Sequence, residues 1–246
     1  MIPFKVNNKE TIFIPSSFED LTFKQVISLG KESTEQEIIK NLTGLDKEQA
    51  SEIIPYLQFL NEKFDFEQIE QKDFFQYKGN LFKIPTVRAC TWAQKILFSN
   101  LLEESKKQNK LNENLTKLLS FYMQPIIDEK KFKIKKVELL AIELENESFI
   151  NIFSATKNLI NQFYALFEYE SKALKKKQTP EQIQAGIKMF DQLGDFNTID
   201  LIASGDVLKY EEVLKIDYNT ILNKLIKMKL TSTFEENLRN ILKNKK

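Results

Sequence analysis

The sequence predicts a mainly α-helical fold, an α+β helical bundle with small β-hairpins near the N-terminus. Three observations support this prediction. After Phe98 the chain carries apolar residues at helical spacing, with helix-capping signals between the segments. The N-terminal part instead contains two sets of short β-prone runs, each arranged around turn residues. Strands and helices do not alternate as they do in a parallel α/β sheet.

The N-terminal part contains two similar stretches, which we interpret as an internal duplication. Residues 4–29 and 75–98 each begin with strand-like runs around a turn, which predicts a hairpin. Both strand pairs end at Ile-Pro, at Ile14-Pro15 and Ile84-Pro85, and proline suits a strand end because it lacks a backbone donor. Two related hairpin–loop–helix units are therefore expected, with chance matching as the alternative.

Each of these units continues with the same helix-start signal. Thr22 is followed by an aromatic residue and by Gln25, and Thr91 is followed in the same way by Trp92 and Gln94. A threonine at the N-cap accepts a hydrogen bond from the backbone three residues on, and the glutamine returns a bond to the cap. Both threonines are therefore predicted to begin helices.

The remaining helices follow from periodicity and capping residues. Pro125 is expected to end one helix, and Gly194 is expected to end the helix that Thr179-Pro180 begins. These helices are predicted at residues 35–42, 46–62 (with Pro55 inside), 91–107, 111–123, 137–145, 149–177, 180–193, 217–229 and 232–243. Two domains are expected, with the hairpin units in residues 1–105 and a helical domain in residues 106–246.

Composition argues against broad nucleic-acid binding. The 36 basic residues nearly balance the 35 acidic ones, giving a net charge of +1. Arg88 and Arg239 are the only arginines, although arginine is the residue best suited to contact phosphate and guanine. The lysine-rich stretch at residues 130–136 alternates like a strand or extended loop, so a nucleic-acid-binding protein remains an alternative.

Signals for catalysis, metals and cofactors are missing from the sequence. The chain has no histidine, the usual general base and zinc ligand. Cys90 is the single cysteine, and we interpret it as a half-buried small residue. The 6 glycines form no phosphate-binding loop. We therefore expect no enzyme and no cofactor, although serine–lysine catalysis is left open because it needs only two common residue types.

The sequence also predicts no membrane segment. No stretch approaches the roughly 18 consecutive apolar residues of a spanning helix, and the N-terminus lacks the apolar core of a signal peptide. Synthesis in a cytoplasm is therefore expected.

Two stretches resemble a known group of proteins. The first runs from the strand end at Ile14-Pro15 through Phe18-Glu-Asp-Leu-Thr-Phe-Lys-Gln25 to the segment Leu42-Thr-Gly-Leu-Asp46. The second, Leu201-Ile-Ala-Ser-Gly-Asp-Val-Leu-Lys-Tyr-Glu-Glu-Val-Leu214, predicts a helix that breaks at Gly205-Asp206 and resumes near Tyr210. Together they resemble tail-assembly chaperones and neighbouring structural proteins of phages that infect Bacteroidetes-like bacteria. Ala93 and Asp195-Phe196-Asn197 depart from that pattern.

The resemblance implies a phage tail-assembly chaperone or scaffold in the host cytoplasm that binds the tape-measure protein. A stable virion component, such as a ring, connector or internal protein, is the alternative. Whether the chain forms a homo-oligomer is left open. Protein binding needs an exposed apolar helix face. The apolar faces of residues 149–167 and 207–225 are candidates, and the alternative for each is that it belongs to the protein core. The candidate protein-binding residues are Phe153, Ile160, Phe163, Phe167, Val207, Leu208, Tyr210, Val213 and Leu214.

Overall fold

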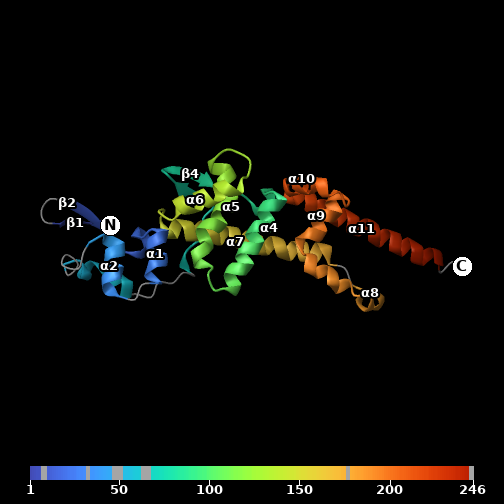
Figure 1. The fold of residues 1–246 in the computed structure, drawn as a ribbon, viewed down its shortest axis with the longest axis horizontal. Helices are drawn as coiled ribbons and strands as arrows, with labels where there is room; N and C mark the ends of the chain where they lie inside the picture. The colour runs from blue at the N-terminus through green and yellow to red at the C-terminus, as the bar shows by residue number, and fades with distance from the viewer. Residues whose placement is uncertain (7–9, 32–33, 46–51, 62–67, 176–177, 244–246) are drawn as a thin grey trace. The chain divides into compact units, whose positions relative to one another are not determined.

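The computed structural model describes residues 1–6, 10–31, 34–45, 52–61, 68–175 and 178–243 (Figure 1). Most of these residues are helical, and the described strands form two separate antiparallel hairpins in the N-terminal part. The predicted fold class is therefore confirmed. The predicted helix start at Asp46 and the turn between the first two strands lie outside the described residues.

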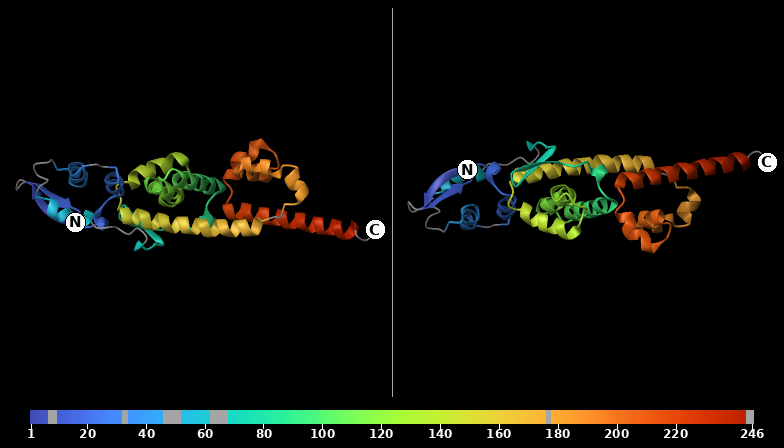
Figure 2. Two further views of the ribbon diagram at one scale, coloured as in Figure 1. Left: turned by 90° about the horizontal axis from the view of Figure 1, so that it is seen from below. Right: turned by 90° about the horizontal axis from the view of Figure 1, so that it is seen from above.

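The chain forms two compact units, and each unit is built from two separate stretches of sequence. Unit 1 comprises residues 1–84 and 101–160, and unit 2 comprises residues 85–100 and 161–246. This division differs from the predicted boundary at residue 105. The physical reason is that α4 (Trp92–Lys107) and α7 (Phe149–Leu174) each contribute one part to each unit. Figure 2 shows α7 as one uninterrupted helix.

Unit 1 contains both hairpins and the helices that pack with them. Its short helices follow capping signals, as at α2 (Glu35–Thr43), where Thr34 caps the start and Gly44, with φ 74°, ends the helix. Its remaining elements are β1 (Ile2–Val6), β2 (Glu10–Ile14), η1 (Phe18–Asp20), α1 (Phe23–Leu29), α2 (Glu35–Thr43), η2 (Ile54–Asn61), β3 (Phe74–Tyr77), β4 (Asn80–Lys83), η5 (Asn112–Asn114), α5 (Leu115–Ile127) and α6 (Ile134–Leu144).

The first hairpin covers a small apolar core of its own. Ile14 and Leu21 are fully buried there, and Phe4 and Ile12 pack partly buried against the same core. The core also includes Ile39, Leu42, Leu45, Ile53 and Leu57 from α2, η2 and the adjoining segments.

The second hairpin turns at Lys78 and Gly79, whose φ values of 48° and 77° are both positive. A two-residue turn with two positive φ values matches the right-handed twist of a hairpin. Phe75 lies on the inner face of this hairpin and is fully buried.

Unit 2 consists of a helical segment and the long C-terminal helix α11. The segment breaks at Ser204 and Gly205, which have φ values of 60° and 76°, one residue before the predicted break at Gly205-Asp206. Its elements, besides its parts of α4 and α7, are η4 (Val87–Ala89), α8 (Pro180–Gln184), η6 (Ile187–Leu193), α9 (Asp195–Ala203), η7 (Val207–Lys209), α10 (Tyr210–Leu214) and α11 (Tyr218–Lys243).

The start of α1 pairs with the start of α7, although the two helices are far apart in sequence. Thr22, the N-cap of α1, forms an antiparallel bridge with Ser148. The Phe23 N–H donates to the Glu147 carbonyl at 2.9 Å, and the Phe149 N–H donates to the Leu21 carbonyl at 2.9 Å. The first N–H groups of a helix have no partner within the helix. The pairing supplies a partner to the first N–H of each helix.

The same arrangement recurs in unit 2 between α4 and α11. Thr91 bridges Asp217. The Trp92 N–H donates to the Ile216 carbonyl, and the Tyr218 N–H donates to the Cys90 carbonyl, both at 2.8 Å. The same sequence separation relates Thr22 to Thr91 and Ser148 to Asp217. Both predicted capping boxes form as well.

Several predicted helix boundaries were wrong. Pro125 lies inside α5, where it removes a single hydrogen bond near the helix end. The helix predicted from Pro180 to residue 193 breaks at Gly186, with φ 82°, into α8 and η6. The two C-terminal helices are one helix, α11, because no glycine or proline interrupts it, and its Thr233 hydroxyl donates to the Lys229 carbonyl.

The lysine-rich stretch keeps its predicted extended form only in part. Residues 131–133 have no regular secondary structure and Lys133 is extended, but α6 begins at Ile134 and makes the rest of the stretch helical. The ring of Phe132 packs against that of Phe121, with centroids 6.5 Å apart. Lys136 forms an ion pair with Asp128 at 2.8 Å. Part of this stretch therefore contributes to packing.

Candidate protein-binding surfaces

The four candidate residues on α7 do not share one exposed face. Phe163 is buried and packs against Phe98, with ring centroids 5.3 Å apart, so its side chain is not available to a partner in this structure. Phe153 and Ile160 are half-buried, and Phe153 packs against Phe149. Phe167 is 55% exposed. Three of these four side chains are therefore wholly or partly covered by the protein itself, and Phe167 is the exposed one.

The candidates between residues 207 and 214 separate into two groups. Val207 and Leu208 on η7 are 66% and 87% exposed. Val213 is buried and belongs to the core, while Leu214 is half-buried. Tyr210 is also half-buried, because its ring packs against Phe196 and its hydroxyl donates to Asp200 at 2.6 Å.

Further exposed apolar residues near these were not among the candidates. Met189 and Phe190 on η6 are 64% and 59% exposed, and Phe196 on α9 is 47% exposed. The Asn197 side chain ties α9 to η6 by donating to the Phe190 carbonyl at 2.7 Å. A 3₁₀ helix lacks the 3.6-residue periodicity used to find apolar faces, so helical spacing could not identify the residues of η6. We call the exposed residues of this segment the 189–208 apolar surface: Met189, Phe190, Leu193, Phe196, Leu201, Val207 and Leu208.

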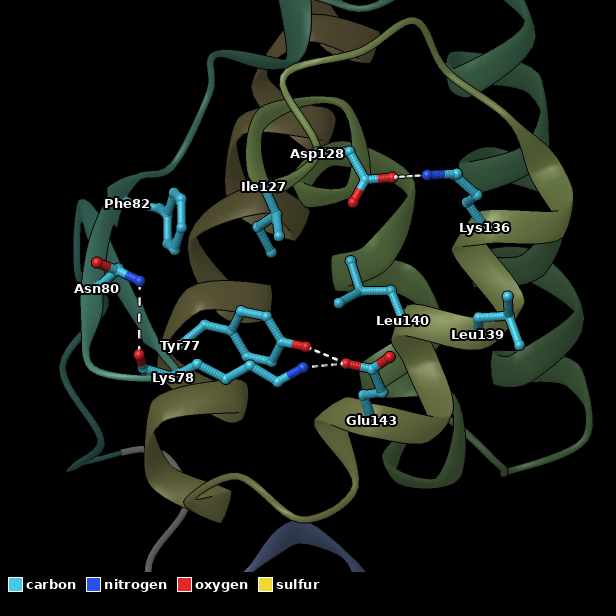
Figure 3. Close-up of a pocket in the computed structure, with 10 residues that line it drawn as sticks. All are labelled: Tyr77, Lys78, Asn80, Phe82, Ile127, Asp128, Lys136, Leu139, Leu140 and Glu143. Carbon is cyan, nitrogen blue, oxygen red and sulfur yellow. Dashed lines mark hydrogen bonds and ion pairs between the residues drawn. The ribbon is translucent and has the colours of Figure 1, made fainter.

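A second candidate site is a pocket of about 410 Å³ in unit 1 (Figure 3). The side chains of Tyr77 and Lys78 both point toward Glu143 on α6. Tyr77 donates a hydrogen bond to that carboxylate, and the Lys78 ammonium lies 2.6 Å from the same oxygen. The pocket is lined by Tyr77, Lys78, Asn80, Phe82, Ile127, Asp128, Lys136, Leu139, Leu140 and Glu143.

The charges of this pocket are paired across its walls. The hydrogen bond from Lys78, followed by that from Tyr77, lowers the pKa of Glu143. The hydrogen bond from Lys136 likewise lowers the pKa of Asp128. Burial, and then the bond to Glu143, raise the pKa of Tyr77, so its hydroxyl keeps its proton at neutral pH. The arrangement holds the second hairpin against α6 and leaves no free nucleophile among these residues.

The β3 edge of the same hairpin is held by α7. The Gln76 N–H donates to the Asn151 side-chain oxygen at 3.4 Å, and the Asn151 amide donates to the Gln76 carbonyl at 2.6 Å. One asparagine therefore satisfies the outward-facing backbone groups of this strand residue, which an edge strand otherwise leaves unpaired.

Two further groups that could support chemistry are buried. Cys90 is 3% exposed, more buried than expected, and its carbonyl serves the paired helix start. Burial raises the pKa of Tyr218, whose hydroxyl donates to Glu170 at 2.7 Å. Across the described ranges, no three acidic, cysteine or histidine side chains gather closely enough to hold a metal ion.

The fold and these surfaces define a class: a mainly α-helical protein with large apolar side chains on its surface. It has two units, each built from two separate stretches of sequence. Comparison with protein-family models, curated protein sequences and solved structures finds no match. None of the described helices has the length and apolar character needed to cross a membrane.

Proposed function

We propose that this chain is a non-enzymatic assembly factor that binds an apolar helical segment of another protein. The observation that carries the proposal is the 189–208 apolar surface, on which Leu208 is 87% exposed and Val207 is 66% exposed. Large apolar side chains that stay exposed cost free energy in water, and several of them within one segment indicate a site of protein association. Their burial against a client helix would recover that free energy.

The charges around this surface favour a basic client. Between residues 188 and 215 the acidic residues outnumber the basic ones, with Asp191, Asp195, Asp200, Asp206, Glu211 and Glu212 against Lys188, Lys209 and Lys215. Charge complementarity around an apolar centre steers association and selects partners. The best-matched client is therefore an amphipathic helix with lysine or arginine on its polar face.

The resemblance to tail-assembly proteins leads to a proposal for the identity of the client. The client is then the tape-measure protein, a long helical chain, and this protein acts as a chaperone or scaffold during virion assembly. A stable virion component would use the same surface in a permanent contact. Mass spectrometry of purified particles separates the two, because a chaperone is absent from particles and a component is present at fixed copy number.

Coexpression with the candidate client tests the proposal. The wild-type chain is expected to keep the client soluble and to copurify with it. A Met189→Glu/Phe190→Glu variant is expected to lose both effects, because it places two carboxylates within the apolar contact. Leu81→Glu is the matched control, since Leu81 is 68% exposed on β4, in unit 1. If Met189→Glu/Phe190→Glu protects the client as well as Leu81→Glu does, the proposal is wrong.

A further inference from the structure

The helix α11 packs against the rest of unit 2 with its first half. The first turns of α11 bury three side chains: Tyr218, Ile221 and Leu222. Farther along, the Lys229 ammonium donates to the Ala173 carbonyl at the end of α7, at 2.7 Å. From residue 233 to residue 243, every residue of α11 is exposed. The end of this helix is therefore not covered by the rest of unit 2.

The exposed end of α11 carries large apolar side chains along one side. We call them the 230–241 apolar stripe: Leu230, Phe234, Leu238 and Ile241. They are spaced four, four and three residues apart, so they lie one above another on the helix. With 3.6 residues per turn, this side faces away from the side that Tyr218 and Ile221 bury. The stripe is therefore a second apolar face, which the core of unit 2 does not use.

The end of α11 also carries an excess of basic residues. Between residues 224 and 243 the charged residues are Lys224, Lys227, Lys229, Arg239 and Lys243 against Glu235 and Glu236. Lys227 stands three residues before Leu230 and is exposed, so its ammonium lies at the edge of the stripe. The end of α11 is thus an amphipathic helix with a basic excess. This is the chemistry that the 189–208 apolar surface favours in a client.

The two surfaces do not cover each other within one copy. Phe234 of the stripe and Phe190 of the 189–208 apolar surface are 64% and 59% exposed in the same chain. An amphipathic helix gains most of its stability from burial of its apolar face, and the 189–208 segment has the opposite charge excess. A contact between these two surfaces would bury both apolar faces and bring opposite charges together.

We infer that the end of α11 of one copy docks on the 189–208 apolar surface of a second copy. This contact rests on the proposed function, because it assigns an occupant to the same surface. It joins two different surfaces, so copies associate either by exchanging helices in a closed dimer or as a ring or chain. The docked helix also competes with the client, so the protein covers its own apolar surface until a client displaces the helix.

Analytical ultracentrifugation provides the first test. The wild-type chain is expected to associate as its concentration rises. Phe234→Glu/Leu238→Glu, which places two carboxylates in the stripe, is expected to raise the dissociation constant at least about tenfold. Leu81→Glu is the matched control, because Leu81 is 68% exposed on β4 in unit 1, and it should associate as the wild type does. A wild-type chain that stays monomeric overturns the proposed contact.

A mixing experiment identifies the second surface. Met189→Glu/Phe190→Glu keeps the helix end and loses the docking surface, whereas Phe234→Glu/Leu238→Glu keeps the docking surface and loses the helix end. Each variant alone is expected to associate weakly, and an equimolar mixture is expected to regain association through the one intact pair of surfaces. Circular dichroism verifies that each variant folds. If Met189→Glu/Phe190→Glu alone associates as tightly as the wild type, the helix ends pair with each other and the proposed contact is wrong.

The client assay separates this contact from the proposed function. Phe234→Glu/Leu238→Glu is expected to copurify with the client at least as well as the wild type does, because it lacks the competing helix end. A wild-type chain that protects the client but stays monomeric contradicts the contact between copies alone. A wild-type chain that associates through these two surfaces but does not protect the client contradicts the proposed function alone.

Discussion

The ring of Trp92 lies nearly parallel to the ring of Tyr218, with centroids 5.5 Å apart and an interplanar angle of 5°. Both side chains are almost fully buried. Phe23 and Phe149 form the corresponding stack in unit 1, with centroids 6.2 Å apart. In each unit, the aromatic residues at the first positions of two helices therefore join chain segments that are distant in sequence.

Replacing Trp92 tests how much this stack contributes. Trp92→Ala is expected to cost about 3–5 kcal/mol in the free energy of unfolding, because it leaves a large cavity. Trp92→Phe is expected to cost clearly less, since it keeps a ring and since the indole N–H has no hydrogen-bond partner within the described ranges. Urea denaturation followed by circular dichroism measures both values, because Trp92 is the single tryptophan and its fluorescence is lost in either variant. Equal costs would argue against the stack.

The capping box at the start of α4 can be tested by a double-mutant cycle. Thr91→Ala and Gln94→Ala are each expected to lower the free energy of unfolding by about 1 kcal/mol. Their combined cost should fall below the sum, because the two side chains bond to each other's backbone. Combining Thr91→Ala with Thr22→Ala should instead give additive costs. Additivity within the first pair would contradict the reciprocal capping.

The Glu143 contacts predict a pH dependence of stability. Because Lys78 and Tyr77 lower the pKa of Glu143 in the folded state, its carboxylate stabilises the fold above its ordinary pKa of 4.5. This contribution is lost as the pH falls through the lowered value. Glu143→Gln is therefore expected to destabilise the protein at neutral pH, by no more than about 1 kcal/mol since the side chain is half-exposed. The difference from wild type should shrink in acid.

Thermal unfolding at several pH values measures this difference. Glu138→Gln serves as the control, because Glu138 is also on α6 and lies 4.0 Å from its nearest cation, Lys117. A constant effect of Glu143→Gln from neutral to strongly acidic pH would show that the charge of Glu143 is not what stabilises the hairpin.

Two glycines near helix ends provide a matched pair of substitutions. Gly44 has φ 74°, and Gly30 has φ −71°, an ordinary helical value. Gly44→Ala is expected to cost about 1 kcal/mol, because an alanine is strained in the left-handed region. Gly30→Ala is expected to be neutral or slightly stabilising, since its added Cβ would make only an ordinary contact, 3.6 Å from the Ile27 carbonyl oxygen. Chemical denaturation compares them, and similar costs would refute the conformational argument.

The helix starts at Thr22 and Thr91 could be predicted because capping depends on residues within one turn. Their pairing with Ser148 and Asp217 could not, because it joins segments far apart in sequence and leaves no periodic signal. The continuity of α11 was missed for a related reason. A threonine or serine followed by glutamate can cap a new helix or lie within an existing one, and the local sequence does not distinguish these cases.

The candidate site was predictable only in part. Apolar spacing marked Phe163 and Val213 together with Val207 and Leu208, yet the first two are buried and the last two exposed. Periodicity identifies an apolar face, but the tertiary neighbours decide whether that face is covered. The pairing of Tyr77 with Glu143 also depends on tertiary contact, which no local motif encodes.

The interleaving of the two units has a consequence for dissecting the protein. A truncation that removes residues 161–246 severs α7 and takes away Asp217, the bridge partner of Thr91. Neither unit can be excised as one continuous fragment with its core intact. Damage to α4 or α7 should therefore lower the stability of both units. Limited proteolysis within either helix is not expected to release one unit intact.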